Sequence, residues 1–417
     1  MQTANAGQPL VDSHLGGCNR VSDQEPADRC PPGNLLGGLS VREFLSRHWQ
    51  KRPLLVRGAV RDWRLPVTLP DLIALAHEPD VASRLITLPG EDRDWSVQRG
   101  PFAAGELELL PETGWTLLVQ EIDRRIDGFA ELLDRFRFIP NWRIDDVMVS
   151  YAPDGAGVGP HIDRYDVFLI QASGRRRWRI ASSPIKEERL RRDVELPVLA
   201  EFEPDQEWVL EAGDMLYLPP RVAHEGVAID HSITCSVGFH GPDPRELCSG
   251  FLRQLPPAFF DRIRYSDPDL TSPENIGEIP LGAREQLRAS AQRLFSETAE
   301  FDRWLGRFVT SPRRNDRPGA RARAHSLHEL QALLDAGGEL KRSAPPHFAW
   351  HREADGTVQL FVGGESYDLG QGKWQTAELL CGRERLDQGA LRPLLGREPF
   401  GGILIDLVLR GFLVPQR

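Results

Sequence analysis

The sequence predicts an α+β protein in which a β-sandwich or small barrel is followed by a helical region and a winged-helix-like domain. Three observations support this fold class. Short apolar strands recur between about residues 142 and 242, helical periodicity follows over 245–310, and residues 320–417 combine helices with a hairpin. At 417 residues the chain is long enough for two or three units, each with its own core.

The N-terminal region is predicted to be a disordered tail over residues 1–36. It is rich in Gly, Pro, Asp and Asn and has few large apolar side chains, so burial there cannot offset the loss of chain entropy. Order is expected to begin near Ser40, which can cap a helix, with Glu43 completing a capping box. Residues 37–244 then form one predicted domain, with its functional core over about 128–244.

The central strands give the strongest secondary-structure signal in the chain. They are separated by Gly- and Pro-containing turns, at a spacing typical of sandwiches and small barrels. The predicted strands are Val147–Tyr151, Val167–Gln171, Arg177–Ile180, Met215–Leu218 and Ile233–Val237. The candidate functional residues lie within or beside these strands.

The region over residues 245–310 is predicted to be helical. Apolar side chains recur there at helical spacing. They define one face with Leu247, Phe251, Leu252 and Leu255, and a second with Leu287, Ala291, Leu294 and Phe295. Such a pair of helices fits either a dimer surface or a cap on the barrel, and the pattern leaves both open.

A polar, breaker-rich segment over residues 311–319 is predicted to be a linker. Beyond it, a helix over 326–336, a hairpin around Gly363 and Gly364, and short helices toward the C-terminus indicate a winged-helix-like domain over 320–417. A fold alone does not define a function. In this acidic chain we favour an accessory role for the domain over DNA binding.

Charge and cysteine content narrow the possible partners and compartment. The formal net charge is -10, from 61 acidic and 51 basic side chains, which favours a basic peptide as partner and disfavours direct nucleic-acid binding. The five cysteines form no CxxC pair, which is typical of a reducing compartment. No apolar run approaches the roughly 18 residues of a membrane span, and the first 30 residues lack a signal-peptide pattern. We therefore expect a cytoplasmic protein without a membrane segment.

The motif His161-Ile162-Asp163 is the densest chemical signal. Residues i and i+2 of a strand project from the same face, so His161 and Asp163 are expected to point together into the barrel. A third ligand is expected from His224, which follows an apolar strand and a rigid Pro219-Pro220 corner. Two histidines and one carboxylate form the facial triad of non-heme Fe(II) oxygenases, although zinc tolerates the same ligands.

Arg176 is the predicted co-substrate anchor. Alternation along its strand places Arg176 on the inward, apolar face with Trp178. A buried guanidinium requires an anionic partner, and the C5 carboxylate of 2-oxoglutarate suits it. Ser150, on a preceding strand, is a candidate second donor. An internal Asp or Glu as the partner of Arg176 remains an alternative.

These motifs together resemble the bacterial JmjC-type ribosomal oxygenases. The resemblance rests on residues 157–168, 174–179, 224–226 and 236–239, and extends to segments such as 44–53 and 142–146. It covers roughly residues 36 to 310, and the C-terminal part resembles the family's winged-helix domain only loosely. Within the family, the match is to the enzymes that hydroxylate an arginine of ribosomal protein uL16.

The resemblance implies a fold, a set of cofactors and a substrate. The implied fold is a double-stranded β-helix of JmjC (cupin-like) type, followed by a helical dimerisation region over 245–310 and a winged helix, in a homodimer. His161, Asp163 and His224 carry over as Fe(II) ligands, and Arg176 and Ser150 as 2-oxoglutarate contacts. The implied reaction uses O₂ to hydroxylate an arginine of uL16 at Cβ.

Other functions remain open at this point. A related oxygenase that hydroxylates a ribosomal histidine or demethylates lysine fits the same motifs, and so, less well, does a non-catalytic cupin-like binding module. Candidates to receive the substrate guanidinium are Asp145, Asp146 and Asp154, and Tyr165 is a candidate to stack on it.

Overall fold

The computed structural model describes residues 34–89, 95–185, 187–262, 264–268, 279–295, 298–312, 326–343, 348–383 and 385–416. The chain divides into two units, residues 1–241 and 242–417. Most of the expected N-terminal tail lies outside the described residues. Leu35 and Leu36, however, are buried in the core of the first unit, so the last two residues of the expected tail pack on the folded domain.

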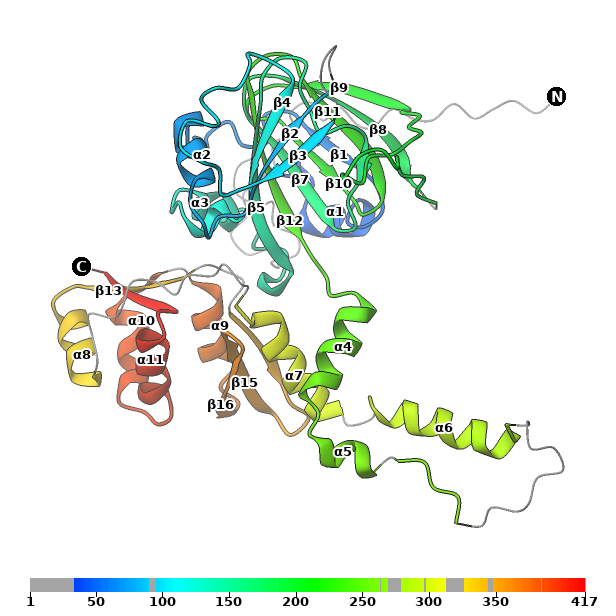
Figure 1. Cartoon of the computed structure of the whole chain (residues 1–417). Coiled ribbons are helices and arrows are strands. Elements are labelled where there is room, and N and C mark those ends of the chain that lie inside the picture. The colour runs from blue at the N-terminus through cyan, green and yellow to red at the C-terminus, as the bar shows by residue number, and fades with distance from the viewer. Residues whose placement is uncertain are drawn as a thin grey trace. The chain divides into compact units, whose positions relative to one another are not determined.

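The first unit is built on two sheets (Figure 1). One has the order β1 (Leu54–Val56), β10 (Met215–Leu218), β7 (Asp166–Ser173), β12 (Ser232–Phe239), β5 (Ile144–Ala152), β4 (Trp115–Val119), β2 (Ser83–Thr87) and β3 (Ser96–Arg99). The other has the order β6 (His161–Ile162), β11 (Val222–Ala228), β8 (Arg176–Pro184) and β9 (Gln206–Leu210). Neighbouring strands are antiparallel, and the five predicted strands are confirmed as β5, β7, β8, β10 and β12.

The two sheets pack face to face through one apolar cluster. Leu169 of β7 and Leu216 of β10 come from the first sheet, while Trp178 of β8 and Val222 of β11 come from the second. Because side chains alternate along a strand, the intervening residues of the first sheet point the other way. The unit is therefore a sandwich of the predicted β-helix type, with one inner layer between the sheets.

The outer face of the large sheet is covered by the helices α1 (Val41–Arg47), α2 (Leu69–Ala76) and α3 (Phe129–Asp134). The predicted capping box of α1 is confirmed: Ser40 Oγ accepts from the Glu43 amide, and Glu43 accepts from the Ser40 amide. Phe44 of α1 lies with its ring centroid 5.8 Å from that of Phe168 and 5.1 Å from that of Tyr217. This outer core fixes the sheet on which the cavity described below is built.

The second unit contains a helical segment and two small sheets (Figure 1). The helices are α4 (Pro244–Gln254), α5 (Pro257–Arg262), α6 (Leu281–Arg293), α7 (Thr298–Thr310), α8 (Leu327–Asp335), α9 (Trp374–Gly382), α10 (Gln388–Leu395) and α11 (Phe400–Leu409). One sheet has the order β17 (Arg385–Leu386), β13 (Glu339–Arg342) and β18 (Leu413–Gln416). The other has the order β14 (Phe348–Arg352), β15 (Thr357–Val362) and β16 (Glu365–Gln371). Most of the predicted linker lies outside the described residues.

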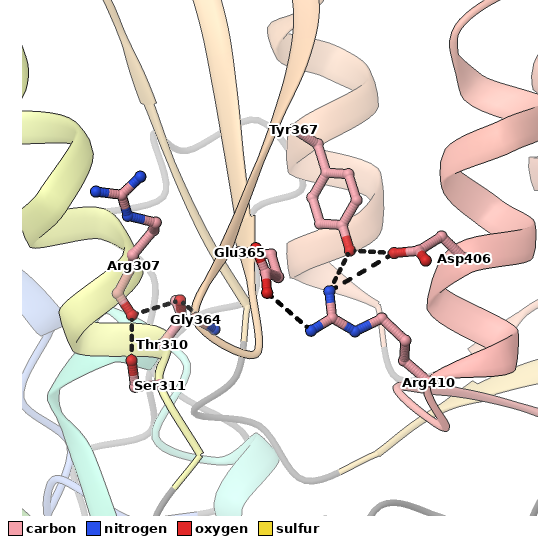
Figure 2. A network of polar contacts seen from close by, with 8 residues as sticks. All are labelled: Arg307, Thr310, Ser311, Gly364, Glu365, Tyr367, Asp406 and Arg410. Carbon is pink, nitrogen blue, oxygen red and sulfur yellow. Dashed lines mark hydrogen bonds and ion pairs between the residues drawn. The ribbon is translucent and has the colours of Figure 1, made fainter.

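Helix α7 belongs structurally to the C-terminal domain as well as to the helical region. Its Trp304 packs on Phe251 of α4, as the predicted apolar face of that helix requires. At its other end, Thr310 Oγ1 accepts from the Gly364 amide in the β15–β16 turn (Figure 2). The sequence predicted a helical region that ends at residue 310 and a separate domain that begins at residue 320. Helix α7 packs on both parts, so the packing shows no boundary directly after this helix.

A second polar network joins β16 to α11 (Figure 2). The Arg410 guanidinium pairs with Glu365 and with Asp406, and Tyr367 donates to Asp406. The network holds the hairpin against the last helix of the winged-helix-like domain. Across the described residues of both units, none of the helices combines the length and the apolar character needed to cross a membrane.

Candidate active site

The predicted triad converges in the first unit. His161 of β6 and His224 of β11 are register partners, which places their rings side by side with centroids 4.3 Å apart. Asp163 lies just beyond β6, because that strand ends at Ile162. The strand that was expected to include Asp163 therefore ends one residue before it. Asp163 Oδ2 nevertheless lies 3.6 Å from His224 Nε2, and ligand atoms from all three residues lie within 4.8 Å of one another.

The Pro219-Pro220 corner fixes the position of Asp163. The residue after the corner, Arg221, adopts a left-handed φ of 68° and donates its amide to the Asp163 carbonyl oxygen at 2.7 Å. A non-glycine residue in that region is uncommon and indicates a local constraint. The corner therefore connects the start of β11, which carries His224, directly to the backbone of Asp163.

Both histidines are oriented by backbone carbonyls. His161 Nδ1 lies 2.9 Å from the Gly159 carbonyl oxygen, and His224 Nδ1 lies 3.0 Å from that of Val222. Because a carbonyl only accepts, each Nδ1 carries the proton and each Nε2 keeps its lone pair for a ligand. Burial, with a smaller contribution from His161, lowers the pKa of His224 to about 4. His224 is therefore neutral at physiological pH, as a metal ligand must be.

Arg176 points into the interior, as alternation along β8 predicts. Its Nη1 donates to Ser150 Oγ at 3.2 Å, while its buried Nε and Nη2 have no hydrogen-bond partner among the described residues. Burial lowers its pKa to about 10. Within the part of the chain that the structure describes, no carboxylate pairs with it, so the alternative of an internal acid is not supported. A guanidinium with two unpaired donor nitrogens fits the carboxylate of a small dicarboxylic acid.

The triad and Arg176 open into one cavity of about 260 Å³. Three side chains of equal parity on β5 line its wall: Ser150 at the Arg176 end, then Met148, then Asp146. Asp145 and Tyr165 also line it, whereas Asp154 is exposed and does not. Two of the three candidate acids and the candidate stacking residue Tyr165 are therefore in the cavity, whereas Asp154 is not among the residues that line it.

Asp146 has an unusual electrostatic environment for a cavity carboxyl. Burial, followed by the nearby carboxylates of Asp145 and Asp123, raises its pKa to about 7. Its Oδ2 accepts from the Glu121 amide at 3.1 Å, which fixes its orientation. Burial also raises the pKa of Tyr165, so that its hydroxyl stays protonated. A carboxyl of this kind is stabilised in its charged form by an incoming cation.

Several cavity residues were not predicted from the sequence. Gln120 and Arg84 come from strands or turns far upstream, and Leu196, Pro197 and Val198 come from the long connection between β8 and β9. Met148 lies two residues before Ser150 on the same strand and so points to the same face. Strand alternation in the sequence could therefore have identified it as a cavity residue. The connection has no periodic pattern that could be recognised in the sequence. Backbone hydrogen bonds hold it in place, such as the one from the Leu199 amide to the Pro160 carbonyl oxygen at 2.8 Å.

The site residues suit the cofactors that they imply. Two neutral imidazoles and one carboxylate on one side of a metal leave other coordination positions free, which is the donor set of Fe(II) oxygenases. The partly unpaired Arg176 presents hydrogen-bond donors suited to an anion. The cavity between them is lined by both apolar and polar side chains, as expected for a small-molecule site.

Two family models match the chain. A JmjC domain matches residues 131–247, and a ROXA-like winged helix matches residues 287–414. The second match begins upstream of the predicted linker and includes all of α7, in agreement with the packing of that helix on the C-terminal hairpin.

Known proteins extend these matches to most of the chain. An Escherichia coli K12 protein named ribosomal protein uL16 3-hydroxylase is 38% identical over 280 residues, which are 66% of this chain and 72% of that protein. The crystal structure of Escherichia coli ribosomal oxygenase YcfD matches with a TM-score of 0.76 and 32% identity, over 91% of this chain and 98% of that one. A YcfD structure in complex with cobalt and 2-oxoglutarate has a TM-score of 0.75 and 32% identity, over 90% and 98%. The chain therefore belongs to the JmjC-type ribosomal oxygenases, a family of Fe(II)- and 2-oxoglutarate-dependent dioxygenases.

Proposed function

We propose that this protein hydroxylates an arginine of ribosomal protein uL16 at Cβ. His161, Asp163 and His224 would hold Fe(II), and Arg176 with Ser150 would hold 2-oxoglutarate. The observation that carries the proposal is the set of groups that share one cavity: Arg176 of β8 next to Ser150 at one end of the β5 wall, the acidic Asp146 toward the other end, and the triad in the same lining. The similarity to the E. coli uL16 3-hydroxylase supports the choice of substrate.

The chain's own residues account for the positioning that the reaction requires. With iron and 2-oxoglutarate bound, the site supplies O₂-dependent oxidation of a C–H bond coupled to conversion of 2-oxoglutarate into succinate and CO₂. Arg176 orients the co-substrate by a charge-assisted contact, and the Nδ1 hydrogen bonds of the histidines fix the ligand lone pairs. Asp146 and Tyr165 would receive the substrate guanidinium and so place the neighbouring Cβ near the metal.

The substrate is tested with three peptides. Incubation with Fe(II), 2-oxoglutarate and O₂ is expected to add one oxygen atom to a uL16 fragment, at a single arginine, with succinate formed in equal amount. Tandem mass spectrometry locates the oxygen. A ribosomal peptide with a target histidine and a peptide with methylated lysine serve as controls. Hydroxylated histidine or demethylated lysine, with the uL16 fragment unchanged, would reject the arginine assignment in favour of one of those activities.

The pH dependence of substrate binding follows from Asp146. The side chains that interact with it electrostatically are Asp145, Asp123, Glu121, Arg84 and Tyr165. Because its pKa is raised to about 7, Asp146 is charged above that pH and neutral below it. A cationic substrate prefers the charged form, so the KM for the fragment is expected to rise as pH falls below 7, approaching roughly tenfold per pH unit.

The control for this prediction is Asp146→Asn, which removes the titrating group at nearly constant volume. Its KM for the fragment is expected to be high and nearly independent of pH between 6 and 8, while its KM for 2-oxoglutarate stays at the wild-type value. A wild-type KM for the fragment that does not change across pH 7 would contradict the role of Asp146.

Assembly and location remain predictions. Helix α6 has no buried residue among those described, and Leu281 and Leu287 on it are 59% and 49% exposed. These apolar side chains support the predicted homodimer through the helical region, which sedimentation equilibrium can measure. The cytoplasmic location, the absence of direct nucleic-acid binding and the accessory role of the winged-helix domain likewise stay predictions from the sequence.

A further inference from the structure

Arg84 is a second guanidinium in the wall of the active-site cavity. It lies on β2, two strands away from β5 in the large sheet. The strand register aligns Arg84 with Leu118 of β4, Leu118 with Ser150 of β5, and Ser150 with Thr234 of β12. All four line the cavity, so they form one cross-strand row along its floor.

The position of Arg84 in this row separates it from the co-substrate anchor. Adjacent strands lie about 4.8 Å apart, so the backbone of Arg84 is roughly 10 Å from that of Ser150, which contacts Arg176. The tip of the Arg84 side chain leans toward the middle of the β5 wall, where its Nη2 lies 4.0 Å from Met148 Sδ. Arg84 thus faces the part of the cavity between the triad and Asp146, away from the Arg176 end.

Arg84 has no acidic partner that would explain its place there. Its Nε is buried and forms no hydrogen bond with any described residue, and no described carboxylate pairs with the guanidinium. Burial lowers its pKa, an effect that Tyr165, followed by Asp146 and Asp163, partly offsets. Its strand neighbour Arg99, in contrast, is exposed and pairs with Glu195. A half-buried cation without a partner is costly unless something in the functional state accepts its hydrogen bonds.

The chemistry of the ligand follows from the geometry of the group. A guanidinium offers five planar donors and no acceptor, and sulfur is only a weak acceptor, so a strong partner is an oxygen such as a carbonyl or carboxylate. The proposed substrate side chain is itself a cation and has no such oxygen to offer. Every protein substrate, however, brings main-chain carbonyl oxygens on either side of its target residue. These carbonyls lie close to the Cβ that has to reach the triad.

We propose that Arg84 binds a main-chain carbonyl of the substrate segment next to the target residue and thereby sets how deeply that residue enters the cavity. This deepens the proposed function, because it assigns a second point of substrate recognition in the same site. The acidic end would select the side chain, and Arg84 would fix the backbone. Two fixed points on one residue determine which carbon lies near the metal.

The test compares Arg84→Met with Arg99→Met. Both remove one positive charge, at directly paired positions on neighbouring strands, but Arg99 does not line the cavity and its exposed ion pair is worth little. Arg84→Met is expected to raise the KM for the peptide at least about tenfold, the loss of one charge-assisted hydrogen bond. The KM for 2-oxoglutarate and the iron content should remain at wild-type values. Arg99→Met should match the wild type throughout.

A conservative variant separates binding from folding. Arg84→Gln keeps a neutral donor and is expected to give a smaller rise in peptide KM than Arg84→Met, and it replaces Arg84→Met if that variant does not fold. A peptide KM within twofold of the wild type in a folded variant would overturn the proposal. A rise in the KM for 2-oxoglutarate in place of the peptide KM would overturn it as well, because Arg84 would then serve the co-substrate.

The result does not depend on which side chain is modified. The variants are compared on whichever of the three peptides above the wild type turns over, since each presents the same main-chain carbonyls. Turnover of a histidine or methyl-lysine peptide in place of the uL16 fragment would reject the proposed substrate. An unchanged peptide KM in Arg84→Met would reject only the role of Arg84.

Discussion

Replacement of Asp163 by alanine is expected to abolish stoichiometric iron binding and to lower the hydroxylation rate by roughly a thousandfold or more. The carboxylate is the only anionic member of the triad, and His161 and His224 would be left as two neutral ligands. A bound metal contributes several kcal/mol of charge stabilisation, and each 1.4 kcal/mol lost is about a factor of ten in rate. Iron content by elemental analysis and succinate release measure the two effects.

Asp154→Ala is the matched control for this variant. Asp154 is an exposed acid that precedes His161 in the chain, and it does not line the cavity. This variant is expected to keep wild-type iron content and turnover. Full turnover in Asp163→Ala would contradict the assignment of the metal ligands, and a strong loss in Asp154→Ala would show that the position of the substrate is wrongly assigned.

Replacement of Arg176 by methionine is expected to raise the KM for 2-oxoglutarate by roughly a hundredfold or more. The side chain is 5% exposed and no described carboxylate pairs with it, so its charge is available to the co-substrate. A buried charge-assisted contact is worth about 3 kcal/mol or more, which corresponds to at least two factors of ten in affinity. Titration of 2-oxoglutarate under anaerobic conditions measures the affinity directly.

Arg177→Met tests whether the effect belongs to the inward position. Arg177 is the next residue on β8, and it is exposed because successive side chains point to opposite faces. Its loss is expected to leave the affinity for 2-oxoglutarate unchanged. Equal effects of the two variants would show that general positive charge, and not the buried Arg176, governs co-substrate binding.

The sequence by itself determined the parts of this protein that depend on local periodicity. Strand alternation placed Arg176 inside, and the spacing of His161 and Asp163 indicated a shared direction, although Asp163 lies beyond the strand. The capping box of Ser40 and Glu43 was also visible, because its hydrogen bonds join residues only three apart. Such features are determined within a few residues, so a pattern is enough to find them.

The tertiary structure alone decided which distant segments share the cavity and where the second domain begins. Arg84 reaches the floor of the site only through a register that crosses β4 to β5, and Leu196 to Val198 reach its wall without any periodic pattern. Helix α7 packs on α4 through Trp304 and contacts the C-terminal hairpin through Thr310, whereas the sequence predicted a domain boundary after this helix. These contacts join residues far apart in the chain, and their pairing is set by the packing of whole sheets and helices, which no local pattern records.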